Sequence, residues 1–104
     1  MYVIHWEKEA LTVMKKIFDW YLEEMETKAA DKFKNSIIKA VNTLEVCPTI
    51  GKIEPMLAHH DKCYRSFAEH SNHKIIYFIE NDIVHIVYIW DNRQSLLKMN
   101  MLVK

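Results

Sequence analysis

The chain has 104 residues, half of them hydrophobic, and its 14 basic residues balance its 14 acidic residues. This length and apolar content suit one domain with a hydrophobic core, and we expect residues 1–104 to form it. The neutral charge argues against nucleic-acid binding by bulk electrostatic attraction. No apolar stretch is long enough to span a bilayer, and the N-terminus lacks the basic-then-apolar order of a signal peptide. We therefore expect a cytoplasmic protein that does not contact a membrane.

The first half of the chain is predicted to form a short strand followed by two helices. Tyr2–Trp6 alternates as a strand does. Apolar residues then recur at spacings of three and four, which predicts amphipathic helices over about 8–26 and 28–46. Because almost nothing separates them, the helices should form an antiparallel hairpin. Their apolar stripes are Leu11, Met14, Phe18, Tyr21, Leu22 and Met25, then Ala30, Phe33, Ile37, Ala40, Val41 and Leu44.

Residues 48–62 are predicted to be a loop that lies over the fold. They contain the single glycine and both prolines of the chain, and Pro55 interrupts any regular element there. The two cysteines, Cys47 and Cys63, are not in a C-x-x-C arrangement, so we expect free thiols. A zinc site could in principle combine Cys63 with the histidines at positions 59, 60, 70 and 73, but their loop positions favour solvated side chains. We therefore expect no metal and no cofactor.

The second half contains a predicted β-hairpin. Ile75–Ile79 and Ile83–Trp90 are rich in β-branched and aromatic residues, and Asn81-Asp82 between them tolerates the positive φ angles of a tight turn. A shorter strand, Tyr64–Ala68, precedes the hairpin, with a turn over 70–73. The N-terminal strand should lie at an edge of this sheet or beside its last strand. The predicted fold class is α+β, with an N-terminal strand and a helix hairpin packed on an antiparallel sheet.

Pairing Glu80 with Ile83 assigns the hairpin residues to two faces, because directly paired residues share a face. The apolar face, expected under the helices, carries Ile75, Tyr77, Ile79, Val84, Ile86, Tyr88 and Trp90. The mixed face carries Lys74, Ile76, Phe78, Glu80, Ile83, His85, Val87 and Ile89. A two-residue turn at Ser71-Asn72 would add Arg65, Phe67 and Glu69 to the mixed face. The candidate site is therefore an open sheet surface with Arg65, Lys74 and His85, which Arg93 adjoins.

From Val3 to Gln94 the chain has a strand, a helix hairpin, a loop and then three strands, and along this order stand Ala30, Phe33, Pro48, Gly51, Tyr64-Arg65, Lys74-Ile75-Ile76-Tyr77 and Arg93. This ordered set resembles the RelE/ParE superfamily of type II toxin–antitoxin toxins, which includes plasmid stabilisation proteins. It implies a small α+β toxin that inhibits bacterial growth and is neutralised by a cognate antitoxin. An amphipathic antitoxin segment would cover exposed apolar surface, to which the six methionines bring adaptable contacts.

The resemblance leaves the target open. RelE-like members are ribosome-dependent mRNA endoribonucleases, and here Arg65, Lys74 and Arg93 would match their cations. His85, His70 or Glu69 would then transfer protons. Phe67 stands at a position that is often basic in RelE-like members, and Leu97 and Met99 follow Arg93 where a Tyr or His is usual. The chain therefore looks closer to ParE-like members, which act on DNA gyrase.

An inactive module that only binds the antitoxin remains an alternative, and the sequence also leaves open whether the chain forms a homodimer. Residues 95–104 are apolar and rich in methionine, and they are interpreted as a short helix or as a tail that contacts a partner. We predict that Arg65, Lys74 and Arg93 converge on one edge of the mixed face. If they serve a phosphate or an acidic partner, at least two of them should be exposed and without a carboxylate partner.

Overall fold

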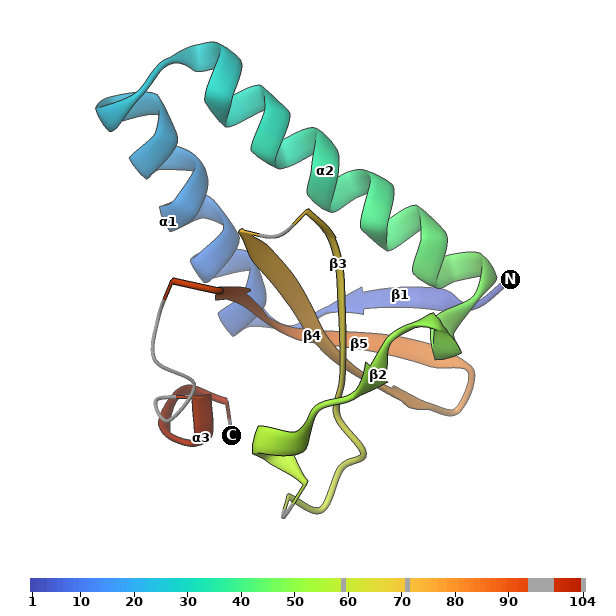
Figure 1. Ribbon diagram of the computed structural model, residues 1–104. Coiled ribbons are helices and arrows are strands. Elements are labelled where there is room, and N and C mark those ends of the chain that lie inside the picture. The colour runs from blue at the N-terminus through green and yellow to red at the C-terminus, as the bar shows by residue number, and fades with distance from the viewer. Residues whose placement is uncertain (59, 71, 94–98, 104) are drawn as a thin grey trace.

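The computed structural model describes residues 1–58, 60–70, 72–93 and 99–103. A five-stranded sheet, ordered β1-β5-β4-β3-β2, carries the two long helices α1 and α2 on one face (Figure 1). The predicted α+β class is confirmed. The elements are β1 Val3–Trp6, α1 Lys8–Glu24, α2 Thr27–Val46, β2 Lys52–Ile53, β3 Arg65–His70, β4 His73–Glu80, β5 Ile83–Asp91 and α3 Met99–Leu102, with short 3₁₀ helices η1 Pro48–Ile50 and η2 Pro55–Leu57.

The N-terminal strand β1 lies beside β5, as expected, but runs parallel to it. The sheet is therefore mixed, which corrects the expectation of a purely antiparallel sheet. Parallel neighbours need a long crossover, and here the whole chain between β1 and β5 provides it. The backbone N–H of Glu7 donates to the carbonyl of Ile86 at 2.9 Å, which extends the pairing to the start of α1.

The helix hairpin is confirmed, with boundaries within two residues of those expected. The side of α2 that faces the sheet is buried, and Tyr21 of α1 stacks on Phe33 of α2 with ring centroids 5.5 Å apart. These helices cover a first hydrophobic cluster on the sheet, which includes Ile75, Tyr77 and Ile86. The apolar stripes of the two helices therefore provide one side of the main core.

The β4–β5 hairpin turns at Asn81 and Asp82, whose φ angles of 55° and 61° confirm the primed turn. The register then changes between Tyr77, which pairs with Ile86, and Ile76, which pairs with Tyr88. Val87 is the extra residue of this β-bulge.

Because of this bulge, the predicted faces of Tyr88, Ile89 and Trp90 are wrong. Tyr88 and Trp90 lie on the mixed face, and Ile89 joins the helix face, because one inserted residue reverses the alternation beyond it. A second buried cluster results, built from Leu57, Tyr64, Ile76, Tyr88, Trp90, Met99 and Val103. The elements η2 and α3 contribute to it, so this end of the mixed face is covered rather than open.

The register between β3 and β4 also departs from expectation. Arg65 pairs with Tyr77 and Phe67 with Ile75, while an irregularity separates Phe67 from His70. Since paired residues share a face, Arg65 and Phe67 lie on the helix face, and their predicted place on the mixed face is wrong. The turn expected at Ser71-Asn72 includes Ser71, which lies outside the described residues.

The Tyr77 hydroxyl anchors the segment that follows α2, where the predicted loop contains η1, β2 and η2. The buried hydroxyl donates to the Pro48 carbonyl at 2.6 Å and accepts from the Gly51 N–H at 3.0 Å. A β-carbon at position 51 would meet the Tyr77 hydroxyl and come within 2.7 Å of the Ser66 carbonyl. Glycine is needed there because two backbones and a ring approach one another, not because of its φ angle, which is −71°.

We expect Gly51→Ala to lower the free energy of unfolding by about 1–3 kcal/mol, the usual cost of overpacking a buried site. Chemical denaturation measures this change. The matched control is the pair Tyr77→Phe and Gly51→Ala/Tyr77→Phe. Removal of the hydroxyl relieves the worst contact, so Gly51→Ala should cost less in the Tyr77→Phe background than in the wild type. Equal costs in both backgrounds would contradict this explanation.

Candidate functional site

Arg65 lies on the helix face at the side of the sheet that meets η1 and β2. Its Nη1 donates to the Gly51 carbonyl at 2.7 Å. The guanidinium therefore binds the backbone of the segment that Tyr77 also anchors. This contact gives Arg65 a structural role in the folded chain.

Lys74 lies on the mixed face and is held by Glu54, which precedes η2. Its Nζ donates to Glu54 Oε1 at 2.5 Å, and Glu54 is 2% exposed. Burial by itself raises the pKa of Glu54. Burial is outweighed by the hydrogen bonds from Lys74 and from the Met56 N–H, together with the positive charge of Lys74. The pKa of Glu54 is therefore lower than its ordinary value. The positive charge of Lys74 thus compensates the negative charge of the buried Glu54 carboxylate.

Arg93 follows β5 and forms a forked ion pair with Asp91. Its Nε and Nη2 donate to the Asp91 carboxylate at 3.0 and 2.7 Å. The guanidinium also lies 5.4 Å from the ring centroid of Trp20 on α1. Its side chain is 58% exposed, so Arg93 remains accessible from solvent.

The three predicted cations do not converge. Arg65 and Lys74 are on opposite faces of the sheet, and Arg93 lies beside α1, on the helix side. Two of the three have carboxylate partners and the third binds a backbone carbonyl. The predicted joint site is therefore wrong in its geometry. The register shift in β3 separates Arg65 from Lys74, and Glu54 reaches Lys74 from a segment that was expected to be an irregular loop.

His85 lies on the mixed face as predicted, and its surroundings come from the N-terminus. Its ring stacks on Phe78 with centroids 4.5 Å apart and planes at 8°. His5 of β1 meets the same ring edge-on at 5.5 Å, and Glu7 Oε1 lies 3.4 Å from His85 Nδ1. Sequence reasoning missed His5 and Glu7. The signal that could have found them is the pairing of β1 with β5, which places His5 opposite His85.

The histidines at 59, 60, 70 and 73 were predicted to be solvated, and for His73 this is wrong because its side chain is buried. Its ring packs edge-on against Phe33 with centroids 4.9 Å apart, and burial lowers its pKa. A histidine that stays neutral in this position fits among the aromatic side chains of the core. His59 lies outside the described residues, and so do the side chains of Glu69 and His70.

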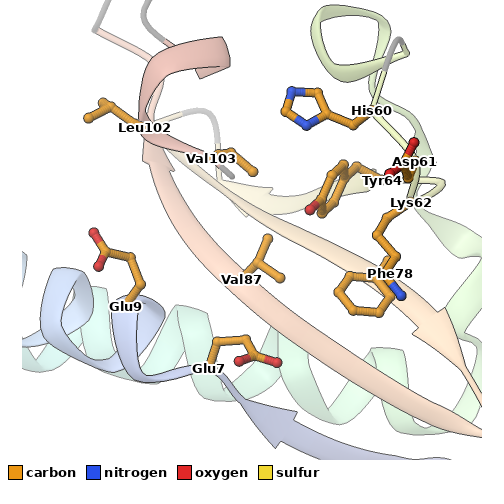
Figure 2. Close-up of a pocket in the computed structure, with 10 residues that line it drawn as sticks. All are labelled: Glu7, Glu9, His60, Asp61, Lys62, Tyr64, Phe78, Val87, Leu102 and Val103. Atoms are coloured by element: carbon orange, nitrogen blue, oxygen red, sulfur yellow. The ribbon is translucent and has the colours of Figure 1, made fainter.

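A groove of about 480 Å³ opens on the mixed face between residues 60–64, the end of α3 and the start of α1 (Figure 2). Val87 and Phe78 lie along its floor, and Tyr64 and His60 stand opposite Glu7 and Glu9. The charged groups that line the groove are mostly acidic. Its lining is Glu7, Glu9, His60, Asp61, Lys62, Tyr64, Phe78, Val87, Leu102 and Val103.

Comparison with known proteins identifies the family. The sequence model of the family described as "ParE toxin of type II toxin-antitoxin system, parDE" matches residues 4–96. The chain belongs to the ParE toxin family. A solved structure of the chromosomal ParDE toxin–antitoxin system from P. aeruginosa shares the fold, with a TM-score of 0.71 and 18% sequence identity over 88% of this chain and 96% of that one. No curated protein matches the sequence.

Membership of this family confirms the resemblance drawn from the sequence and makes the chain a ParE-like toxin. The family pairs each toxin with an antitoxin, so a cognate antitoxin is the expected partner. Among the described residues, no helix is both long and apolar enough to span a lipid bilayer.

We expect Lys74→Met to destabilise the protein by about 2–4 kcal/mol at pH 7, because it leaves the buried Glu54 carboxylate unpaired. The pKa of Glu54 in the folded state lies below its ordinary value of 4.5. The pair therefore stabilises the fold above about pH 4.5, and this contribution is lost as the pH falls through the lower folded-state pKa. The difference between wild type and variant, measured by urea denaturation, should shrink between pH 5 and pH 3.

The matched control is Glu54→Gln/Lys74→Met, which removes both charges. It should recover part of the lost stability and show little pH dependence in this range. A Lys74→Met effect that stays constant down to pH 3, or a double variant no more stable than the single one, would contradict the assigned role.

Proposed function

We propose that this toxin inhibits growth by acting on DNA gyrase and that its cognate antitoxin neutralises it by binding the groove of the mixed face. The family match over residues 4–96 is the observation that supports DNA gyrase as the target. Gyrase poisoning needs a contact surface rather than a set of reacting groups. An exposed Arg93 and an open groove are compatible with that requirement.

Ribosome-dependent mRNA cleavage is the second candidate, and the geometry supports it less well. Attack of a 2′-hydroxyl on the adjacent phosphate needs a proton acceptor, a proton donor and cations around one phosphate. Arg65 and Lys74 lie on opposite faces of the sheet and are bound to Gly51 and Glu54. One phosphate cannot contact both without refolding of β3. Among the predicted catalytic residues, Lys74 and His85 keep their places on the mixed face, but Lys74 is held by Glu54.

The groove suits an amphipathic antitoxin segment with basic residues beside its apolar anchors. Phe78 and Val87 present partly buried apolar surface at its floor. Glu7, Glu9 and Asp61 contribute negative charge, which Lys62 offsets only in part because Lys62 pairs with Glu80. Charge complementarity of this kind directs a partner to a surface and selects its register. An inactive antitoxin-binding module would use the same groove.

We expect the purified full-length toxin to inhibit supercoiling by DNA gyrase and to leave ribosome-bound mRNA intact. Arg93→Ala should remove this inhibition and leave the thermal midpoint within a few degrees, because exposed ion pairs contribute only about 0–1 kcal/mol. The control is Lys15→Ala, which breaks another exposed ion pair, that with Asp19, and should inhibit as the wild type does.

The outcomes separate the proposals. mRNA cleavage without gyrase inhibition would replace gyrase by the ribosome as the target. Activity in neither assay, with antitoxin binding retained, would identify an inactive module. Gyrase inhibition by Arg93→Ala equal to that of the wild type would keep the target and remove Arg93 from the contact surface.

We expect the charge reversal Glu9→Lys/Asp61→Lys to weaken antitoxin binding at least ten-fold, because both side chains are exposed and line the groove. Isothermal titration calorimetry at low and high salt measures the effect, which should diminish as salt screens the charges. The matched control, Glu23→Lys/Glu24→Lys, makes the same change in net charge at the other end of α1. Equal weakening by both double variants would show that the antitoxin responds to net charge and does not bind in this groove.

A further inference from the structure

Two histidines and one glutamate meet where β1 passes into α1. His5 is on β1, Glu7 is the residue that precedes α1, and His85 is on β5 directly opposite His5. Glu7 Oε1 lies 3.6 Å from His5 Nε2 and 3.4 Å from His85 Nδ1. The three candidate ligand atoms all lie within 4.8 Å of one another.

Two of these three separations match the ligand spacing around a tetrahedral metal ion, and the third is at most 4.8 Å. Zinc binds histidine nitrogen and carboxylate oxygen at about 2.0–2.2 Å, so its tetrahedral ligands lie about 3.3–3.6 Å from each other. The two distances from Glu7 Oε1 fall in this range. Two imidazoles and one carboxylate also favour zinc and neighbouring transition metals over calcium or magnesium, which prefer oxygen ligands.

The three side chains are held in place by the fold, which lowers the cost of assembling a site. The Glu7 backbone N–H is bonded to the Ile86 carbonyl, and the β1–β5 ladder fixes His5 against His85. Stacking on Phe78 fixes the plane of the His85 ring. The Glu7 carboxylate makes no capping hydrogen bond to α1, so it remains directed at the histidines.

His85 Nδ1 lacks the partner that a buried nitrogen normally has. The atom is buried and makes no hydrogen bond to any described residue, although Glu7 Oε1 is near. Buried polar atoms without a partner are rare and call for an explanation. A histidine nitrogen and a carboxylate oxygen that both point toward a shared ion lie at this distance without the direct alignment of a hydrogen bond.

We propose that His5, Glu7 and His85 form a binding site for one divalent transition-metal ion, with zinc the best fit. The His5 side chain is 56% exposed, so the fourth position of the ion faces solvent and takes a water molecule. The ion links the edge strand β1 to β5 and to the start of α1. It therefore stabilises the folded chain and leaves the groove floor at Phe78 and Val87 unchanged.

The test uses the full-length chain with Cys47→Ser/Cys63→Ser, because both exposed thiols could bind zinc themselves. After treatment with a chelator, zinc is titrated and followed by calorimetry and by thermal unfolding. We expect one ion per chain and, at 100-fold excess over Kd, a rise in the unfolding midpoint of roughly 10 °C. Magnesium at the same concentration should cause no shift.

Matched variants decide the assignment. His5→Gln changes an exposed side chain and should abolish the zinc-dependent shift without loss of folding, as should Glu7→Gln. His60→Gln, on the opposite wall of the groove, should keep the full shift (Figure 2). Absence of a zinc shift in the parent chain, a shift that survives His5→Gln and Glu7→Gln, or an equal shift with magnesium would each overturn the proposal.

Discussion

The extra residue at Val87 determines which side chains the central strands present to the two layers of the molecule. Before the bulge, Val84 and Ile86 of β5 face the helices, whereas beyond it Ile89 does so and Trp90 faces the opposite side. One inserted residue thus divides the apolar content of β5 between two clusters. The large ring of Trp90, fully buried, becomes part of the second core, and η2 and α3 pack over that core as α1 and α2 pack over the first. Both layers depend on this local irregularity.

The helices and the β4–β5 hairpin could be predicted because their signals are local. Apolar spacing of three and four defines the helical stripes, and Asn81-Asp82 is compatible with the positive φ angles of the turn. The bulges could not be predicted. Residues 86–90 are all apolar or aromatic, so alternation does not report the register there, and either face could accept them. The parallel pairing of β1 also has no local signal, because it depends on a strand at the other end of the chain.

The candidate site was harder to predict than the fold, because its residues were inferred from a resemblance and a register. Arg65 changes face through one irregularity in β3, and Lys74 is engaged by Glu54 from a segment with little regular structure. His85 was singled out, but the residues that surround it, His5 and Glu7, come from the N-terminus. A cluster built from distant strands becomes visible only when the pairing of those strands is known.

The parallel pairing of β1 with β5 has a consequence for how the chain folds during its synthesis. β1 is translated before both long helices, but its partner β5 is translated after those helices and after the other strands of the sheet. The helix hairpin contains mainly local contacts and can form early, whereas closure of the sheet edge requires contacts between distant residues and is therefore slow. The apolar side chains of β1 and α1 remain uncovered until that step. A newly made toxin thus closes the β1 edge of its sheet only after β5 has been synthesised.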